Sequence, residues 1–354
     1  MSWRCSVYMT FANLMKRLFL LLTVALMVAA CSDPLVQKKH FKTEVLLKMT
    51  PVKNAKAEGL GWIYGMLATI ETERLMLGDS VNLSPAYLTR LYLMDQVERR
   101  YQAHGVQEIT IQGTGMAALH LLERKGVIAF DSYRVSQSLN WSLLIRQLTM
   151  MTDVSWAHRR KWEELKNEVG DLLDRKMSPA PRFVFMYGCE YTPLQFAQSV
   201  CKKDDFLPLT SFTHHPFGSP FALETPGNYA QEYYQNIPID TLISTMEHTL
   251  RAGHAVYWEG NAVDGEYSFK EGIARIEGAS EPVTQEKRQA AFERFRGEKL
   301  HGLSMIGLAV DGEGQKYFIC KDSRGIKNPY RGLVYMSFDY ARMHTFLVLV
   351  PKNV

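Results

Sequence analysis

Hydrophobic positions recur at three- and four-residue spacing immediately after a polar loop that begins near residue 50. They are Trp62, Ile63, Met66, Leu67 and Ile70, which fall on one side of a helix. A helix with such a face packs against other elements along its whole length. We therefore predict a buried helix at the centre of a domain.

Three further stretches have helical patterns, and one of them has a clear start. Residues 83–101 have Ser84 as a suitable N-cap and Pro85 at the first helical position, where a missing N–H costs nothing. Residues 141–176 are polar with regularly spaced apolar positions, which is typical of helices on the surface of a core. Another helix is predicted over residues 283–292.

Short runs with strand character are concentrated near the C-terminus. Residues 317–321, 333–336 and 345–350 are apolar or alternate, and turn residues separate them. Together with the helices, these runs predict an α+β fold in which the strands close a small antiparallel β-barrel.

The first 30 residues have the pattern of a targeting segment. Lys16 and Arg17 precede an apolar run over residues 18–30, which ends in Val-Ala-Ala and is followed by Cys31. The run is too short to span a hydrocarbon core of about 30 Å, and its small final residues suit a signal peptidase. Because this ending resembles a bacterial lipobox, we predict a lipoprotein signal peptide. An ordinary secretory signal is the alternative.

A lipid on Cys31 would anchor the mature protein to a membrane of the bacterial cell envelope, on the periplasmic side or at the surface. The segment that follows is polar and lacks periodicity at first. We therefore predict a tether over residues 31–47 and a folded domain over residues 48–354.

The charge of the chain argues against a nucleic-acid partner. The formal net charge is +4, and it falls to +1 without Arg4, Lys16 and Arg17 of the predicted signal peptide. A nucleic-acid surface requires clustered Lys and Arg, which the near-neutral remainder lacks. Hydrophobic residues make up 46% of the chain, which is enough for one or two sizeable cores.

Three cysteines remain once Cys5 and Cys31 are assigned to the leader and the lipid anchor. They are Cys189, Cys201 and Cys320, an odd number that leaves at least one thiol free. A disulfide between Cys189 and Cys201 is one interpretation, and burial as small hydrophobic residues is the favoured one. None of the three begins an amphipathic helix.

The stretch TPVKNAKAEGLGWIYG, residues 50–65, resembles the active-site loop and helix of papain-like cysteine peptidases, most closely the branch of bleomycin hydrolase and the bacterial aminopeptidases C. In that family a Gln precedes by six residues a Cys that opens the helix and is followed by Trp. Trp62 matches the Trp. Ala55 stands at the Gln position and Gly61 at the position of the nucleophilic Cys.

The resemblance continues through most of the chain. Residues 300–309 resemble the strand that begins with the catalytic His of the family, which places His301 at that position. Asp322 stands where the family has Asn, and Arg324 where it has Trp, a substitution that should shield the dyad from water less well. Gly113 and Gly115 correspond to the loop along which a substrate backbone runs. Further similarity covers the motifs YTPLQF, TSFTHHPF, NIPID and VYWEG between residues 191 and 260.

The resemblance implies a papain-like fold of two lobes with a cleft between them. The helical lobe is expected over residues 48–200 and the barrel-rich lobe over residues 201–354. Relatives also carry a C-terminal tail that reaches into the cleft, and the resemblance extends no further than Val354. Aminopeptidase specificity is therefore not carried over.

The chemistry of the family requires a thiolate at a helix N-terminus beside an imidazole, and a donor to the oxyanion. Gly61 has no side chain, and Ala55 cannot donate, a loss that costs on the order of a hundred- to a thousand-fold in rate. We therefore predict a pseudopeptidase that binds a peptide or a protein in or near the cleft. An active hydrolase with an unidentified nucleophile is the alternative, and an error in the sequence at Gly61 is a third interpretation.

No cofactor is predicted from the sequence. His214 and His215 are adjacent, but no third metal ligand stands at a recognisable spacing, so no metal site is predicted. Analogy with oligomeric relatives suggests a homo-oligomer. The predicted partners are thus a peptide or protein ligand, further copies of the chain, and the membrane through Cys31.

Overall fold

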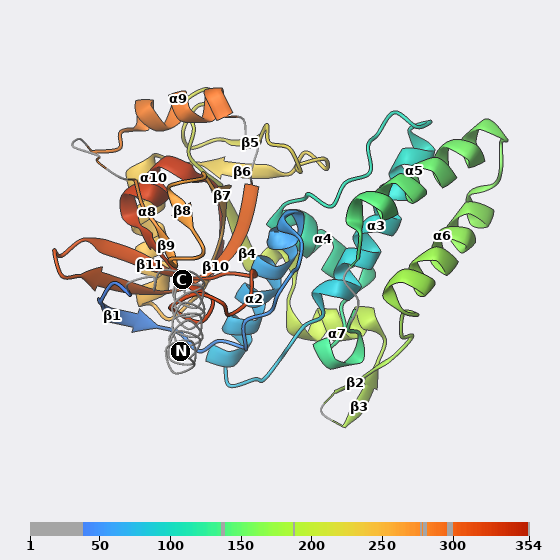
Figure 1. Ribbon diagram of the computed structural model, residues 1–354, viewed down its shortest axis with the longest axis horizontal. Coiled ribbons are helices and arrows are strands. Elements are labelled where there is room, and N and C mark those ends of the chain that lie inside the picture. Colours follow the sequence, from blue (N-terminus) through green and yellow to red (C-terminus); the bar gives the residue numbers. More distant parts are fainter. Residues whose placement is uncertain are drawn as a thin grey trace, which may run out of the picture. The chain divides into compact units, whose positions relative to one another are not determined.

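Elements before residue 200 are mostly helices and elements after it are mostly strands in the computed structural model (Figure 1). The structure describes residues 38–352 apart from 136–138, 187, 277, 279–281 and 296–299. The predicted signal peptide and Cys31 lie outside these residues. Within the described part, none of the helices combines the length and the apolar character that crossing a membrane requires.

The central helix α2, Gly61–Met76, is confirmed as a buried element, because Trp62, Ile63 and Ile70 are all at least 96% inaccessible. Helix α3 begins as predicted, with the side chain of Ser84 accepting a hydrogen bond from the Tyr87 amide. The other helices of this side are α4 (Gly115–Lys125), α5 (Trp141–Ala157), α6 (Trp162–Met177) and α7 (Pro193–Val200), and α3 spans Pro85–Gln102. Short 3-10 turns are η1 (Glu58–Leu60), η2 (Phe130–Ser132) and η3 (Lys203–Asp205).

The strands form one large sheet and a separate hairpin. Along the sheet the order is β5-β6-β4-β13-β7-β10-β11-β12-β9-β8, and β1 pairs with β10 beside this path. The strands of the sheet are β1 (Phe41–Leu46), β4 (Phe206–Thr210), β5 (Pro220–Ala222), β6 (Tyr233–Asn236), β7 (Val256–Asn261), β8 (Tyr267–Ser268), β9 (Ile273–Ala274), β10 (Leu300–Asp311), β11 (Lys316–Lys321), β12 (Leu333–Ser337) and β13 (Thr345–Pro351). The hairpin consists of β2 (Val184–Met186) and β3 (Cys189–Tyr191).

The α+β class is confirmed, but the prediction of an antiparallel barrel is not. The pairs β4–β6 and β12–β9 are parallel, so the sheet is mixed. The pairings among the described strands also form an open path, with β5 at one end and β8 at the other. Alternation along a strand predicts which face is buried but not which strand it pairs with, and short strands such as β6 and β9 carry little alternation.

The predicted tether over residues 31–47 is wrong in its last part. Phe41 to Leu46 form β1, which pairs antiparallel with β10, and Phe41 stacks on Tyr335 with ring centroids 4.0 Å apart. The side chain of Lys39 also forms an ion pair with Asp311. Since β1 is an edge strand with mostly exposed side chains, its sequence resembles that of a polar linker.

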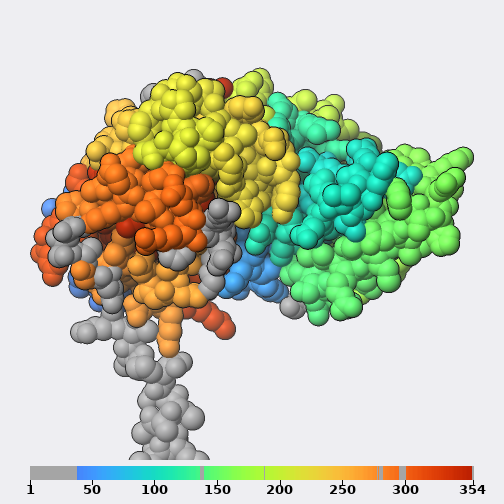
Figure 2. Space-filling model, turned by 90° about the horizontal axis from the view of Figure 1, so that it is seen from above, coloured from blue at the N-terminus to red at the C-terminus, as the bar shows by residue number. Residues whose placement is uncertain are grey.

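Helices α8 (Ile239–Arg251) and α10 (Phe338–His344) also pack against the sheet, and α9 (Gln285–Phe295) packs against α10. Seen from above, the cyan and green residues of α3 to α6 lie at one end, and the yellow to red residues of the strands lie at the other (Figure 2). Helix α2 therefore lies where the helical side meets β10.

Candidate active site

Gly61 is the first residue of α2, at the position that the resemblance assigns to the nucleophile. A β-carbon on Gly61 would lie 2.6 Å from Nδ1 of His301 and 2.9 Å from its Cε1. Real β-carbons essentially never approach other heavy atoms more closely than 3.0 Å. The structure thus brings Gly61 and His301 together, and the imidazole occupies the space that a side chain at position 61 would need.

His301 lies on β10, opposite Gly260 of β7, and its ring is oriented by a carboxylate. Its Nε2 donates to Oδ1 of Asp322 over 3.1 Å, while Nδ1 faces Gly61. Both side chains are at least 96% buried. The remnant dyad predicted from the sequence is therefore assembled, with one ring nitrogen bound to Asp322 and the other turned toward the missing nucleophile.

The environment of Asp322 keeps the carboxylate ionised. Burial alone would raise the pKa of Asp322, but the charge and hydrogen bond of His301, the charge of Arg324 and the hydrogen bond from Tyr267 together lower it. The Arg324 amide donates to Oδ1 over 3.0 Å, and the Tyr267 hydroxyl donates to Oδ2 over 2.5 Å. A carboxylate held by these donors fixes the orientation of the ring.

Tyr267 is a member of this site that the sequence did not reveal. Its ring meets the His301 ring edge-on with centroids 5.9 Å apart, and the Arg324 guanidinium lies 5.1 Å from the Tyr267 centroid. Tyr267 therefore covers the dyad, and Arg324 in turn lies over Tyr267. Because Tyr267 comes from the two-residue strand β8, it has no local signal that links it to His301.

The side chain at the position of the oxyanion donor has no hydrogen-bond donor. Ala55 is buried, and its backbone N–H donates to the Ser323 carbonyl over 2.7 Å. A second donor in acyl-transfer sites is the backbone N–H of the nucleophile itself. Here the Gly61 N–H is bonded to the Glu58 carbonyl at the end of η1. The N–H groups at both positions are thus used internally.

The residues predicted to bind substrate are held in internal packing. Trp62 is 4% exposed, and its indole N–H donates to the Ile111 carbonyl over 2.8 Å. A β-carbon on Gly113 would lie 2.6 Å from the Trp62 ring, and one on Gly115 would lie 2.4 Å from the ring of Tyr257. Packing against these two rings therefore explains both glycines without a ligand.

A buried carboxylate lies beneath the same loop. The Gly115 amide donates to Oε2 of Glu259 over 3.2 Å, and the Tyr257 hydroxyl donates to the same oxygen over 2.5 Å. Oε1 has no hydrogen-bond partner within the described part of the chain. Burial raises the pKa of Glu259 to about 7, although the bonds from Tyr257 and Gly115 oppose the shift.

Helix α2 and strand β10 approach each other with their backbones. A β-carbon on Gly65 would lie 2.8 Å from the Gly302 carbonyl carbon, and one on Gly302 would lie 2.6 Å from the Cα of Trp62. Glycines at positions 61, 65 and 302 thus allow a contact too close for side chains. The junction between the two sides is closed at the place where a nucleophile would project.

The three remaining cysteines lie in different elements, Cys189 on β3, Cys201 at the end of α7 and Cys320 on β11. Cys201 and Cys320 are buried, and burial raises the pKa of both thiols, so neither forms a thiolate near neutral pH. Cys189 is exposed, which corrects the prediction that it is a buried hydrophobic residue, and it lies on the β2–β3 hairpin beyond α7 (Figure 1). All three are free, so the disulfide between Cys189 and Cys201 is absent from this structure.

A helix N-terminus that faces a histidine on an adjoining sheet is the arrangement of the papain-like cysteine peptidases, although here Asp322 orients the histidine in place of the Asn of the family. The solved structure of PepW from Lactobacillus rhamnosis HN001 superposes with a TM-score of 0.67 at 17% identity, covering 88% of this chain and 82% of that chain. The fold of this chain is therefore papain-like.

Sequence relatives indicate the branch. Aminopeptidase W of Lactobacillus delbrueckii subsp. lactis is 27% identical over 172 residues, 46% of this chain and 39% of the relative. The mitochondrial cysteine proteinase 1 of Saccharomyces cerevisiae strain S288c is 22% identical over 376 residues, 88% of this chain and 77% of the relative. The matches to aminopeptidases W and G thus span less than half of those proteins. No family model matches the sequence. The fold is that of the aminopeptidase C branch.

Proposed function

We propose that this chain is a pseudopeptidase of the aminopeptidase C type, which binds a peptide or protein and does not hydrolyse it. The observation that carries the proposal is the position of His301, whose Nδ1 would lie 2.6 Å from a β-carbon at Gly61. In a working site this volume belongs to the nucleophile. Here the general base is retained, but no thiol, hydroxyl or amine stands between it and a substrate.

The oxyanion position supports the same conclusion. An oxyanion donor contributes on the order of a hundred- to a thousand-fold to the rate of acyl transfer. Ala55 has only a methyl group, and its N–H is bonded to Ser323. Recruitment of another cysteine is opposed by the raised pKa of the Cys201 and Cys320 thiols and by the position of Cys189 on a hairpin beyond α7.

The proposal is tested by assaying the purified chain with aminoacyl and peptidyl fluorogenic substrates. We expect no turnover above that of the His301→Ala variant. Turnover by the unmodified chain that His301→Ala abolishes would refute the proposal. A cysteine-directed peptide inhibitor provides a second readout, because labelling of Cys189, Cys201 or Cys320 together with loss of turnover would establish an active hydrolase.

The variant Gly61→Cys tests whether the site lacks only a thiol or also lacks the space for one. Ordinary contact begins near 3.4 Å, so the His301 ring must move by about 1 Å to admit a β-carbon. We expect Gly61→Cys alone to remain inactive, and Gly61→Ala to change the imidazole signals of His301 in the NMR spectrum in the same way. Full activity of Gly61→Cys with unchanged His301 signals would show that the imidazole does not block the site.

Binding without cleavage is the second half of the proposal. Peptides that carry a photo-crosslinker are expected to label the exposed residues beside the predicted substrate-binding positions, Glu58 before α2 and Gln112 before Gly113, and to be recovered intact by mass spectrometry. The control is the same crosslinking reaction with a protein of equal size whose charged residues have been scrambled. Recovery of cleaved peptides, or labelling spread evenly over the surface, would contradict binding at this site.

We also propose that the mature protein is held at the bacterial envelope by a lipid on Cys31, as the lipobox-like ending of residues 28–31 indicates. Cells that express the full chain should incorporate labelled palmitate into it. The variant Cys31→Ser should lose the label and the Cys189→Ser control should retain it. Labelling that survives Cys31→Ser would place the lipid elsewhere.

A further inference from the structure

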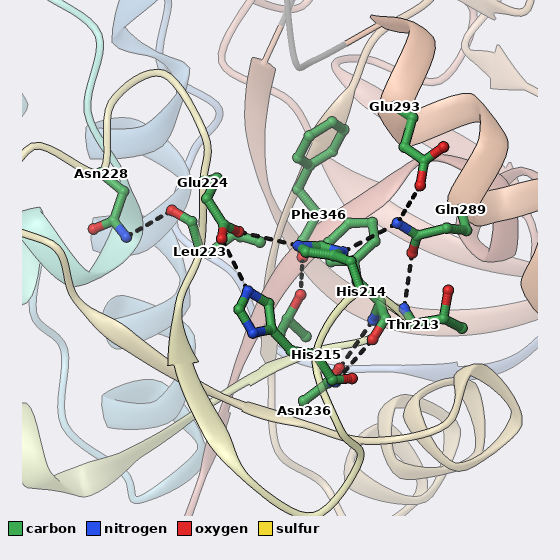
Figure 3. A network of polar contacts seen from close by, with 12 residues as sticks. Thr213, His214, His215, Leu223, Glu224, Asn228, Asn236, Gln289, Glu293 and Phe346 are labelled. Atoms are coloured by element: carbon green, nitrogen blue, oxygen red, sulfur yellow. Dashed lines mark hydrogen bonds and ion pairs between the residues drawn. The ribbon is translucent and has the colours of Figure 1, made fainter.

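Two adjacent histidines and one glutamate converge outside the remnant dyad. His214 and His215 lie between β4 and β5, and Glu224 follows β5. Nε2 of His214 is 3.1 Å from Oε2 of Glu224, and Nε2 of His215 is 2.9 Å from Oε1 (Figure 3). One ligand atom from each residue lies within 4.8 Å of the others. Glu224, placed after β5, is thus the third ligand that the sequence spacing did not reveal.

Packing orients both imidazole rings. The His215 ring stacks on Phe221 with centroids 4.1 Å apart and planes 22° apart. The His214 ring stacks on Phe292 with centroids 5.4 Å apart and planes 13° apart. Stacked rings lose few rotamers when a ligand binds, and their Nε2 atoms are already directed at the two oxygens of the Glu224 carboxylate.

The loop that carries the histidines is anchored by a buried amide. Asn236 has no exposed surface, and its Oδ1 accepts from the Phe212 amide over 2.9 Å. Its Nδ2 donates to the carbonyls of Phe212 and His215 over 2.8 and 2.9 Å (Figure 3). The backbone on which the two histidines stand is therefore positioned before any ligand arrives.

Gln289 sets a condition on binding by His214. Its Oε1 accepts from the Thr213 amide over 2.8 Å, which directs its Nε2 to Nδ1 of His214 over 3.0 Å and to Glu293 over 3.0 Å. A histidine that binds a metal through Nε2 carries its proton on Nδ1 and needs an acceptor there. Gln289 presents a donor instead, so its amide must move away when a metal binds.

We propose that His214, His215 and Glu224 form a binding site for a divalent transition-metal ion of the Zn²⁺ class. Two imidazoles and a carboxylate suit Zn²⁺ and its neighbours, whereas Mg²⁺ and Ca²⁺ prefer oxygen ligands alone. Three protein ligands leave a fourth tetrahedral position for water or another ligand. The three side chains are 28%, 36% and 57% exposed, so an ion reaches them from solvent.

The site would act on the backbone around Gly113 through a short loop. Glu224 begins the segment that leads to Gly227, and a β-carbon on Gly227 would lie 3.2 Å from the Cα of Gly113. Asn228 holds the same loop by donating to the Leu223 carbonyl over 3.0 Å (Figure 3). A metal bound to Glu224 would therefore restrain the loop that packs on Gly113.

The test titrates the whole chain, freed of metal by chelator, with zinc chloride in a calorimeter and with cobalt(II) chloride in a spectrophotometer. We expect one equivalent to bind, with the visible d–d bands of tetrahedral cobalt. His215→Ala and Glu224→Gln should each weaken binding about tenfold or more. Hydrogen exchange in residues 223–228 should slow when zinc is added.

Two further variants distinguish this site from surface binding. His254→Ala removes a histidine that pairs with Glu73 but belongs to no such group of three ligands among the described residues, and it should leave the affinity unchanged. Gln289→Glu supplies the missing acceptor to Nδ1 of His214 and should strengthen binding about tenfold. Absence of saturable binding to the unmodified chain, or binding that survives both His215→Ala and Glu224→Gln in folded protein, would overturn the proposal.

Discussion

Replacing Glu259 by Gln should make the protein more stable in base and leave it unchanged in acid. The pKa of Glu259 rises from an ordinary 4.5 to about 7 in the folded protein, because burial disfavours the carboxylate. The folded state therefore binds the proton more tightly than the unfolded state. Below pH 4.5 both states are protonated and the residue contributes nothing to the pH dependence.

As the pH rises from about 4.5 to 7, the unfolded chain ionises first, so the free energy of unfolding falls by about 1.4 kcal/mol per pH unit. Over the shift of Glu259 the loss amounts to about 3 kcal/mol and persists above pH 7. The variant Glu259→Gln keeps an oxygen that can accept from Gly115 and Tyr257, but it carries no ionisable group.

The measurement is urea unfolding at pH 5 and pH 8, followed by tryptophan fluorescence. We expect Glu259→Gln to exceed the unmodified protein by about 2.5 kcal/mol more at pH 8 than at pH 5. The control Glu123→Gln removes an exposed glutamate of α4 and should show no such difference. An equal effect of Glu259→Gln at both pH values would refute the reasoning, because it would mean that Glu259 does not titrate differently on folding.

Two further predictions concern packing and capping. Gly302→Ala should destabilise the protein by about 1–3 kcal/mol in thermal unfolding, because its β-carbon would meet the Trp62 backbone at 2.6 Å. Gly170→Ala lies in the middle of α6, where a β-carbon meets nothing within 4 Å, and should instead stabilise by about 0.5–1 kcal/mol. If both variants changed the stability in the same direction, the approach of α2 and β10 would not be tight. Ser84→Ala should lower the free energy of unfolding by about 1–2 kcal/mol in chemical unfolding, because the hydroxyl caps α3 and also donates to the Tyr133 carbonyl. An effect no larger than that of replacing an exposed serine such as Ser142 would contradict this role.

Local patterns were sufficient for the elements that carry the site. The apolar face of α2 follows from spacing alone, and the start of α3 follows from Ser84 and Pro85, because both depend on residues within a few positions of each other. The strands β11, β12 and β13 were predicted to within one residue at each end. The partners of those strands were not, since pairing depends on segments that are distant in the sequence.

The absence of a sulfur at Gly61 and of an amide donor at Ala55 is determined by the sequence alone. Only the tertiary structure decides that His301 fills the vacated space, that Tyr267 covers the dyad, and that Glu224 reaches the two histidines. Each of these contacts joins residues from separate segments, and no periodicity along the chain records such a distance. Glycines likewise permit the backbones of α2 and β10 to approach closely. The distance between them is determined by the packing of the whole sheet against the helix.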